Sequence, residues 1–305
     1  MHISVLICAH NPRADYLGRV LHSLRAQTLP LAQWELLLID NASKVPLSTT
    51  ADLAWHPSGR HVREEELGLT PARLRGVREA QGELLVFVDD DNVLQPDFLE
   101  IAAGIARDWP QLGTWGGRVQ PEFEQPPEEW TRPLWGLLAI REVTQDYWSN
   151  VPDLSSPAMP CGAGLCIRRS LALDYAQQLR NDGVRRKLDR RGAELTSCGD
   201  SDLVLNVYAR GFGSGVFARL KLTHLIPPVR VTEAYFLRLI EGMEYSRAML
   251  NEMNGARENS FSLRFPWLAH LSYWARFDAR TRRRVAAALR GKIRADREIR
   301  RGTSA

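Results

Sequence analysis

The chain has 305 residues, of which 44% are hydrophobic and 25% charged, and this ordinary globular composition allows a substantial buried core. It lacks an apolar run near the roughly 20 residues of a membrane span, and its first residues do not resemble a secretory signal, so we expect a cytoplasmic protein. The net charge is only +4, and residues 276–301 supply more than all of it, with eleven Arg or Lys against three acidic residues.

Strand and helix patterns alternate at the start of the chain. Short apolar runs predict the strands, and apolar residues at helical spacing predict the helices between them. We predict strands at 3–9, 34–40 and 84–88 and helices at 14–27 and 70–81, the second helix with Thr70 as its cap and Pro71 as its first residue. Such alternation is typical of a parallel sheet with right-handed crossovers.

Polar residues follow each of the three predicted strands. They are His10 and Asn11, then Asp40 and Asn41, then residues 89–91. Ligands of open α/β sheets bind at the carboxyl ends of the strands, so these residues predict a binding site, although any one of them alone could be a solvated loop start. No GxGxxG segment follows the first strand, which argues against dinucleotide binding.

The aspartates Asp89, Asp90 and Asp91 come directly after the apolar run Leu84–Val88. Carboxylates beside a buried strand are costly unless a positive group compensates them. Hard oxygen ligands suit Mg²⁺ or Mn²⁺, and such ions are commonly shared with the phosphates of a nucleotide. We therefore expect a divalent metal cofactor, Mn²⁺ or Mg²⁺. The four cysteines include no CxxC pair and indicate neither a zinc site nor a disulfide framework.

The rest of the chain changes character twice. Residues 110–165 hold many tryptophans and prolines, which indicates either core and loop packing or an aromatic platform for a sugar-like acceptor. Residues 233–250 have helical spacing, and a break at Pro266 and Trp267 separates them from the basic tail. Three roles stay open for this tail: a solvated helix, a helix on anionic lipid into which Val285, Leu289 and Ile293 could insert, or a nucleic-acid contact.

Four segments together resemble the family 2 glycosyltransferases of GT-A fold. They are ISVLICAHN, LLIDNAS, GLTPARLRGVREAQGELLVFVDDDN and CGDSDLVLNVYARGFG, in matching order over about residues 3–225. The resemblance implies an α/β fold with a Rossmann-like, mostly parallel central sheet flanked by helices. It divides the chain into a catalytic domain (1–225), with a nucleotide-binding half (1–110) and an acceptor-binding half (111–225), and a helical C-terminal extension (226–305).

The resemblance also implies roles for particular residues. Asp91 would hold the metal, with His224 completing the site, although a histidine on a strand is often structural. Asp89 would reach the nucleoside, and Arg73 would lie near the base and phosphates. The full set expected to bind the nucleotide-sugar is Ala9, His10, Asn11, Asp40, Arg73, Asp89 and Asp90.

Inversion at the anomeric carbon needs one base that takes the acceptor's proton. The family's EDxDL segment matches residues 199–203 and places this base at Asp200. An acidic pair, Asp200 and Asp202, could instead merely stabilise the start of a helix. The chain departs from the family pattern at Gly199, where Glu is frequent, at Cys198, where Gly is frequent, and at Leu74, where Asn is frequent.

The sequence therefore predicts a metal-dependent, inverting glycosyltransferase. Its expected donor is a UDP-sugar, and its expected acceptor is a hydroxyl of a glycan, a lipid-linked sugar or a small molecule, as in polysaccharide or glycolipid synthesis. The alternatives are a nucleotide-sugar-binding protein without turnover and a metal-dependent nucleotidyltransferase. No nucleic-acid partner is expected, and the basic tail would allow peripheral contact with the inner face of the membrane.

Overall fold

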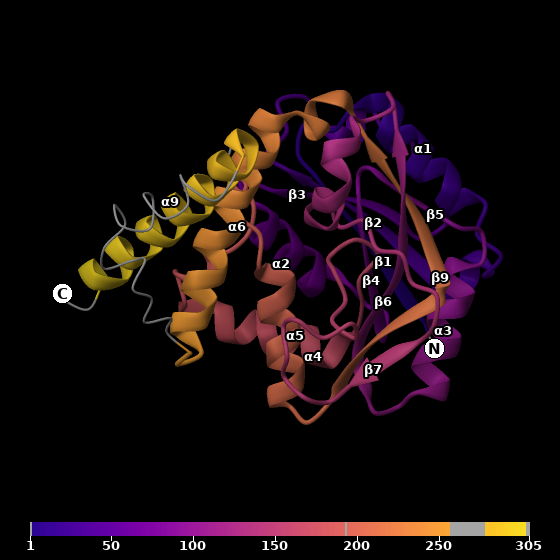
Figure 1. Cartoon of the computed structure of the whole chain (residues 1–305). Helices are drawn as coiled ribbons and strands as arrows, with labels where there is room; N and C mark the ends of the chain where they lie inside the picture. Colours follow the sequence, from indigo (N-terminus) through magenta and orange to yellow (C-terminus); the bar gives the residue numbers. More distant parts are fainter. Residues whose placement is uncertain (1, 193, 257–277, 303–305) are drawn as a thin grey trace.

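The computed structural model describes residues 2–192, 194–256 and 278–302. Its centre is a mixed sheet in the order β3-β2-β1-β4-β8-β6-β9-β5, with β7 paired to β9 (Figure 1). The strands are β1 Ile3–Ala9, β2 Trp34–Asn41, β3 Gly59–Glu64, β4 Leu84–Asp89, β5 Asn92–Leu94, β6 Leu112–Phe123, β7 Tyr147–Ser149, β8 Cys166–Arg168 and β9 Gly213–Ile226.

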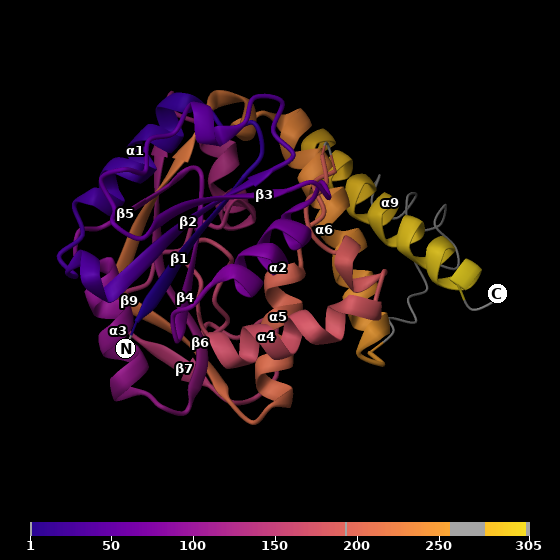
Figure 2. The ribbon, with the colours of Figure 1, turned by 180° about the vertical axis from the view of Figure 1, so that it is seen from behind.

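Helices cover both faces of this sheet, as the opposite views of Figures 1 and 2 show. Helices α1 and α3 pack with one buried apolar cluster, and α2, α4 and α5 pack with a second cluster on the other face. The helices are α1 Ala14–Arg25, α2 Leu69–Glu79, α3 Phe98–Asp108, α4 Arg169–Gln178, α5 Gly199–Ala209, α6 Glu233–Met253 and α9 Ala279–Gly302. The α/β class with flanking helices is thus confirmed.

Burial on both faces explains why the strands read as continuous apolar runs. Side chains alternate along a strand, so Val5 and Ile7 of β1 enter the cluster under α1 and α3, while Leu6 enters the cluster under α2. Strand β1 pairs in parallel with both β2 and β4. The carboxyl ends of these three strands therefore lie side by side, as the sequence predicts.

The start of α2 differs from the prediction. The helix begins at Leu69, and its cap is Gly68 rather than Thr70, which lies buried within the first turn. Gly68 has φ = 145°, a conformation that glycine adopts far more readily than other residues, and its N–H donates to Asn41 Oδ1 over 2.8 Å. Pro71 consequently occupies the third helical position, where its missing N–H still costs nothing. The other predicted elements form within about two residues of their expected bounds.

Antiparallel strands join the second half of the chain to the first. Strand β9 runs beside β6 and pairs with β5, which places His224 opposite Asn92. Near the end of β9, Leu138, Ile226, Phe236 and Leu239 form an apolar cluster that fixes α6 and the 3₁₀ helix η3 (Glu129–Leu138) to the sheet. The division into domains stays a prediction, and α6 packs directly on the predicted catalytic part.

The basic tail forms α9, which lies along α6 in both ribbon views (Figures 1 and 2). Ion pairs join the two helices, among them Arg283 to Glu233 and Arg290 to Glu241, both over 2.8 Å. Leu289 is only 8% exposed, so the idea that it inserts into lipid is wrong: its side chain is already buried within the protein. Pro266, Trp267 and Arg276 lie outside the described residues. Within the described parts, no helix is both long and apolar enough to cross a membrane.

Candidate active site

One cavity of about 510 Å³ gathers most of the predicted site residues at the carboxyl edge of β1 and β4. Its walls come from segments far apart in the sequence, from the end of β1 to the first turn of α6. The predicted residues that line it are Ala9, His10, Asn11, Arg73, Asp89, Asp90, Asp91, Asp200 and His224. Of the predicted set, Asp40 is the one residue that does not line this cavity.

The end of β1 is joined to the loop after β2 by short hydrogen bonds. His10 Nδ1 lies 2.6 Å from the carbonyl oxygen of Asn41 and donates to it, since a carbonyl can only accept. Asn11 has φ = 47°, and its N–H donates to Ser43 Oγ over 2.9 Å while its Oδ1 accepts from the N–H of Lys44. These contacts fix the rim of the cavity where the nucleotide base is expected.

Asp40 is buried and holds the loop after β2 in place. Its carboxylate accepts from the N–H groups of Ser43 and Leu47, each over 3.0 Å, and from Arg63 over 2.7 Å. Burial alone would raise the pKa of Asp40, but these hydrogen bonds outweigh it and hold the pKa below its usual value. Its neighbour Asn41 lines the cavity instead, so Asp40 is placed to shape the site rather than to face it.

Arg73 of α2 lines the cavity and lies between two carboxylates. Its guanidinium is 3.2 Å from Asp189 and 4.0 Å from Asp89. Burial acts to lower the pKa of Arg73, but the negative charges of Asp189 and Asp89 raise it above its usual value, so the side chain stays charged. Sequence reasoning did not identify Asp189, because it stands in the charge-rich segment RRKLDRRG without any motif around it.

Asp189 explains the departure at Gly199. A Cβ at position 199 would lie 2.2 Å from Asp189 Oδ2, so the carboxylate of Asp189 occupies the space that a side chain there would need. The N–H of Gly199 points at the same carboxylate over 3.4 Å. A carboxylate from another segment thus stands where the family pattern often places the side chain of Glu.

Asp200 and Asp202 have separate environments although both lie in the first turn of α5. Asp200 faces the cavity, and its Oδ2 accepts from the N–H of Gly162 over 2.8 Å. Asp202 is fully buried, accepts a hydrogen bond from Tyr175 over 2.8 Å and forms an ion pair with Arg185. Only Asp200 is therefore available to a ligand in the cavity.

The three consecutive aspartates carry more negative charge than their surroundings balance. Burial, followed by the charges of Asp91 and Asp89, raises the pKa of Asp90 to about 8. Asp91 has one positive neighbour in contact, because Arg230 Nη1 lies 2.8 Å from Asp91 Oδ2. A cation bound at this edge would favour the ionised form of all three carboxyl groups.

His224 presents one ring nitrogen to Asp91. Its Nδ1 lies 3.0 Å from the carbonyl oxygen of Leu138 and must carry the hydrogen of that bond. In the neutral ring, Nε2 then has a free lone pair, and it lies 3.4 Å from Asp91 Oδ2. An oriented imidazole with its second nitrogen hydrogen-bonded to a carbonyl is a common metal ligand.

The chemistry of this pair fits a divalent cation. Two adjacent ligands of one Mn²⁺ or Mg²⁺, each at about 2.1 Å from the ion, lie about 3 Å apart, close to the observed separation. Among the described residues, no group of three His, Cys, Asp or Glu side chains is arranged to hold a metal. Asp91 and His224 would therefore be the protein's share of the ligands, and nucleotide phosphates and water the remainder.

Three further arginines that sequence reasoning did not identify line the cavity, namely Arg13, Arg190 and Arg230. Arg230 Nη1 donates to Asp91 Oδ2 over 2.8 Å. Arg190 follows Asp189 directly and also lines the cavity. The proline pair before Arg230 indicates a rigid turn but does not reveal its direction.

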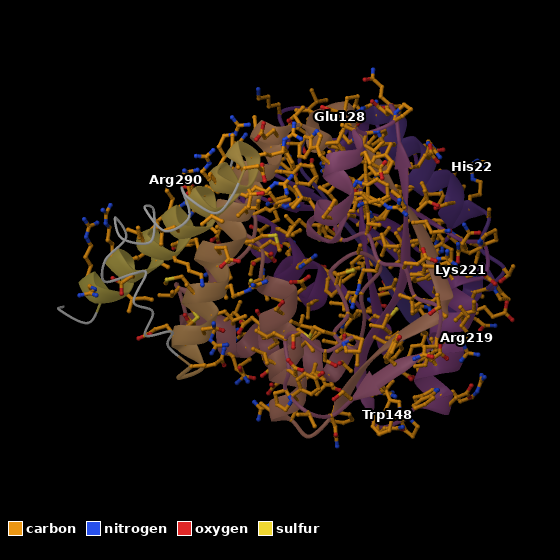
Figure 3. All side chains as sticks on the ribbon, viewed as in Figure 1. His22, Glu128, Trp148, Arg219, Lys221 and Arg290 are labelled. Atoms are coloured by element: carbon orange, nitrogen blue, oxygen red, sulfur yellow. The ribbon has the colours of Figure 1, made fainter. Side chains whose placement is uncertain are left out.

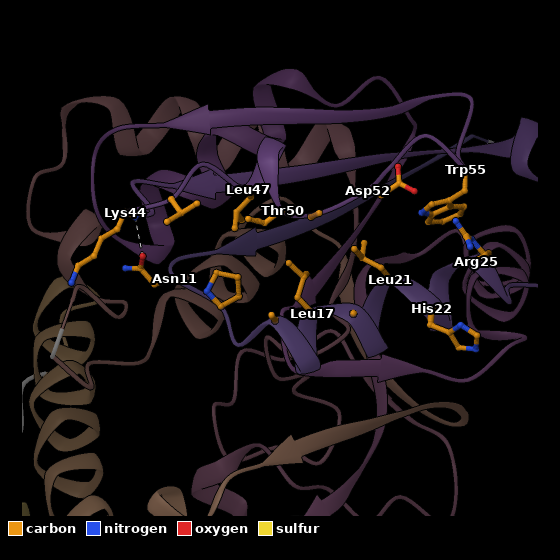
Figure 4. A pocket seen from close by; sticks show the side chains of 15 residues that line it. Asn11, Leu17, Leu21, His22, Arg25, Lys44, Leu47, Thr50, Asp52 and Trp55 are labelled. Carbon is orange, nitrogen blue, oxygen red and sulfur yellow. Dashed lines mark hydrogen bonds between the residues drawn. The ribbon is translucent and has the colours of Figure 1, made fainter.

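A second cavity, of about 670 Å³, lies between α1 and the loop after β2 (Figure 4). Leu17 and Leu21 enter it from the helix, and Leu47 and Trp55 enter it from the loop. Asn11 is the one predicted site residue on its wall. The predicted catalytic and metal-binding residues, Asp200, Asp91 and His224, line the first cavity and not this one.

The tryptophans of the middle region lie away from the first cavity. Trp148, which Figure 3 shows at the edge of the molecule, pairs with Gly215, at the opposite end of β9 from His224. Trp130 packs on Phe236 and on the guanidinium of Arg280, 4.3 Å from its ring centre. The described residues that line the cavity include no tryptophan, which favours core and loop packing over an acceptor platform.

The central sheet with helices on both faces and the acidic end of β4 is the arrangement of a GT-A fold. Residues 4–160 match Glycosyl transferase family 2, and the chain belongs to this family.

Two proteins of Haloferax volcanii are similar in sequence. Glucosyl-dolichyl phosphate glucuronosyltransferase is 24% identical over 165 residues, which cover 50% of this chain and 52% of that protein. Glycosyltransferase AglE is 28% identical over 104 residues, 32% of this chain and 33% of that protein. The match thus spans about half the length of the first relative and a third of the second.

Among solved structures, the chain is similar in fold to TarS 1-349 of S. aureus in complex with UDP-GlcNAc. The TM-score is 0.55 at 13% identity, and the match covers 99% of this chain and 92% of that one. Another crystal structure of TarS 1-349 gives a TM-score of 0.52 at 14% identity, with the same coverage of both chains. At this identity the likeness shows the fold alone.

Proposed function

We propose that this chain transfers a sugar from a nucleotide-sugar, with UDP as the nucleotide, to an acceptor hydroxyl with inversion. One observation carries the proposal: a single cavity brings Arg73, the aspartates after β4, His224 and Asp200 together. Its volume of about 510 Å³ lies within the usual range for small-molecule sites. The fold of TarS, which is described in complex with UDP-GlcNAc and with UDP, supports the choice of donor.

Mn²⁺ or Mg²⁺ would be held by Asp91 and His224. When bound there, the cation would neutralise negative charge on the departing diphosphate. Arg73, which stays charged between Asp89 and Asp189, is the residue best placed to attract the diphosphate from the wall of the cavity. The rim around His10 and Asn11 would receive the nucleotide base.

Asp200 would act as the general base. In a single displacement, the acceptor oxygen forms its bond to the anomeric carbon while the bond from that carbon to the diphosphate breaks, and the acceptor's proton passes to Asp200. The hydrogen bond from Gly162 orients the carboxylate, and its other oxygen accepts from the N–H of Ser201. A carboxylate can accept about four hydrogen bonds, so lone pairs remain for the acceptor hydroxyl.

For the acceptor, we favour a lipid-linked sugar over a free glycan or a small molecule, in the synthesis of a glycolipid or polysaccharide. The name of one relative contains a dolichyl-phosphate-linked sugar. The wall of the cavity beside His224 comes from Leu137, Leu138 and Ala139 of η3 and its end, which gives the acceptor an apolar side. An enzyme with such an acceptor would work at the inner face of a membrane.

The test is a panel of UDP-sugars with Mn²⁺, analysed for products with and without candidate acceptors. Sugar transfer with release of UDP supports the proposal. Release of pyrophosphate would identify a nucleotidyltransferase instead. Binding of UDP-sugar, detected as a Mn²⁺-dependent rise in melting temperature but without any turnover, would identify a non-catalytic binding protein.

A further inference from the structure

Two hydrogen-bond acceptors face each other at the proposed cation site. The Nδ1–H of His224 is used by Leu138, so the neutral ring turns a lone pair on Nε2 toward Asp91 Oδ2, 3.4 Å away. Both side chains are at least nine-tenths buried, so water does little to screen them. Acceptors repel at this distance unless a positive group lies between them.

Arg230 supplies that positive group. Its Nη1 lies 2.8 Å from Asp91 Oδ2 and 3.1 Å from His224 Nε2, so one nitrogen donates to both acceptors. The residue belongs to the 3₁₀ helix η6 (Pro228–Val231), which follows β9 directly, and its N–H donates to the carbonyl oxygen of Pro227. The guanidinium thus occupies the position that a cation shared by Asp91 and His224 would take.

We propose that Arg230 and the divalent cation are alternative occupants of the Asp91–His224 pair. The inference rests on the proposed function, whose metal ligands are the same two side chains. A guanidinium and a dication cannot share one carboxylate oxygen and one imidazole lone pair, because the two positive charges would repel at contact distance. Arg230 therefore holds the pair in the absence of cation and leaves it when the cation binds.

The displaced guanidinium has a second partner when a nucleotide is present. Arg230 and Arg190 both line the cavity, and a diphosphate offers arginine a bidentate, charge-assisted contact. The contact of Arg230 with the diphosphate then replaces its ion pair with Asp91. Cation and nucleoside diphosphate should consequently bind with positive cooperativity, and by linkage each should strengthen the other equally.

A purely structural role of Arg230 leads to the opposite expectation. If the guanidinium only orients Asp91 and His224, its removal leaves the ligands disordered and weakens the binding of cation. If it competes with the cation, its removal strengthens binding in the absence of nucleotide. The sign of the change in Mn²⁺ affinity therefore separates the two roles.

The experiment measures Mn²⁺ binding to the full chain without nucleotide, by electron paramagnetic resonance of the free ion. We expect Arg230→Ala to bind Mn²⁺ roughly tenfold more tightly than the wild type, the equivalent of one lost charge-assisted hydrogen bond, and Arg230→Lys to lie between them. Arg219→Ala, at an exposed position of β9 (Figure 3), removes the same charge elsewhere and should change nothing. Asp91→Asn removes a ligand and should abolish binding.

A second measurement adds UDP. In the wild type, saturating UDP should strengthen Mn²⁺ binding, and in Arg230→Ala this gain should be smaller because the competitor is already absent. Thermal unfolding checks the fold: without metal, Arg230→Ala should have a lower melting temperature than the wild type, and Mn²⁺ should restore it.

The inference has a clear contrary outcome. Unchanged or weaker Mn²⁺ binding by Arg230→Ala without nucleotide overturns it. If UDP binds neither to the wild type nor to any variant while Arg230→Ala still binds Mn²⁺ more tightly than the wild type, the proposed function fails and the competition between Arg230 and the cation stands.

Discussion

Asp200 and Asp202 lie two positions apart on one helix, yet their side chains point to different surroundings. Successive helical residues are rotated by about 100°, so two residues apart the side chains leave the helix on nearly opposite sides. Asp200 therefore points into the cavity, while Asp202 points toward Tyr175 and Arg185 in the protein interior. The same acidic residue type thus faces the cavity at one position and contacts the protein interior at the other.

We expect Asp200→Asn to lower kcat by roughly 10²–10⁴-fold with little change in UDP affinity, because the variant loses the proton acceptor but keeps the shape of the site. Steady-state kinetics and calorimetric titration of UDP check this expectation. Asp202→Asn is the matched comparison: it should reduce stability by about 3 kcal/mol, the usual scale for breaking a buried ion pair, and affect kcat less. A greater loss of kcat in Asp202→Asn would exchange the two roles.

Gly199 and Asp189 form a second pair of residues that depend on each other. The carboxylate of Asp189 fills the space beside Gly199 and pairs with Arg73 over 3.2 Å. A side chain at position 199 would therefore displace the carboxylate of Asp189.

We expect Gly199→Ala to lower the melting temperature and to weaken UDP binding, because the added methyl group pushes Asp189 away from Arg73. Asp189→Gly alone should also lower the melting temperature and weaken UDP binding, because Arg73 loses a partner. Adding Gly199→Glu to Asp189→Gly should restore part of the melting temperature and part of the UDP affinity, since a carboxylate returns to the same space from the other chain segment. Differential scanning calorimetry and UDP titration of the single and double variants form a double-mutant cycle. Additive effects in that cycle would show that the two positions are independent.

At the level of secondary-structure elements, Glu35 ties the starts of β1, β2 and β4 together. Its carboxylate accepts from Ser4 Oγ and from the N–H of Gln81, each over 2.6 Å, and from Arg60 over 3.0 Å. Burial alone would raise the pKa of Glu35, but these donors outweigh it and hold the pKa below its usual value. The clamp lies at the amino ends of the strands, opposite the cavity edge, so it supports the sheet rather than the reaction.

The lowered pKa of Glu35 gives stability a definite pH dependence. Because the folded state binds this proton more weakly than the unfolded state, the contribution is complete above the unfolded pKa near 4.5 and is lost as pH falls through the lower folded value. We expect Glu35→Gln to reduce the free energy of unfolding by roughly 1–3 kcal/mol at pH 7, because donors lose a buried charged partner. Denaturant unfolding from pH 7 to pH 3 should show this difference shrinking, and a constant difference would contradict the argument.

For the whole molecule, the C-terminal helices decide which charges face outward. Helix α9 packs along α6, where Ala295 lies in one apolar cluster with Tyr245, Met249 and Leu250, and its Ala287 and Leu289 are also buried. Arginines at exposed positions recur with spacings of one or two turns and form a basic face, here called the α9 stripe: Arg283, Arg290, Arg294, Arg297 and Arg301. Three of these also pair with acidic residues, namely Glu233, Glu241 and Glu194. The outward contact that remains for a membrane is electrostatic.

We expect the protein to sediment with anionic but not with neutral vesicles at low salt, because each arginine near an anionic surface contributes about 1 kcal/mol. Reversing two charges of the α9 stripe, Arg297→Glu with Arg301→Glu, should abolish this binding without loss of fold. Arg219→Glu, on the opposite side of the molecule in Figure 3 from Arg290, should have a smaller effect. If the wild type ignores anionic vesicles even at low ionic strength, the lipid-linked acceptor loses this support.

The sequence by itself determined the first three parallel strands of the fold and the edge at which they end. Apolar runs that are buried on both faces predict β1, β2 and β4, and the polar residues after them predict the edge on which His10, Asn11 and residues 89–91 meet. These signals are local: each depends on a few neighbouring residues and on the rule that parallel strands end at the same edge.

Only the tertiary structure decided which polar groups face the cavity and which stabilise the fold around it. It turned Asp40 toward Arg63 and Asp202 toward Arg185, and it brought Asp189 and Arg230 to the site from segments without any motif. It also closed the apolar side of α9 against α6. Such outcomes depend on side-chain direction and, for Asp189 and Arg230, on contacts with residues more than a hundred positions away. Neither the period of a pattern nor the spacing of a motif contains this information.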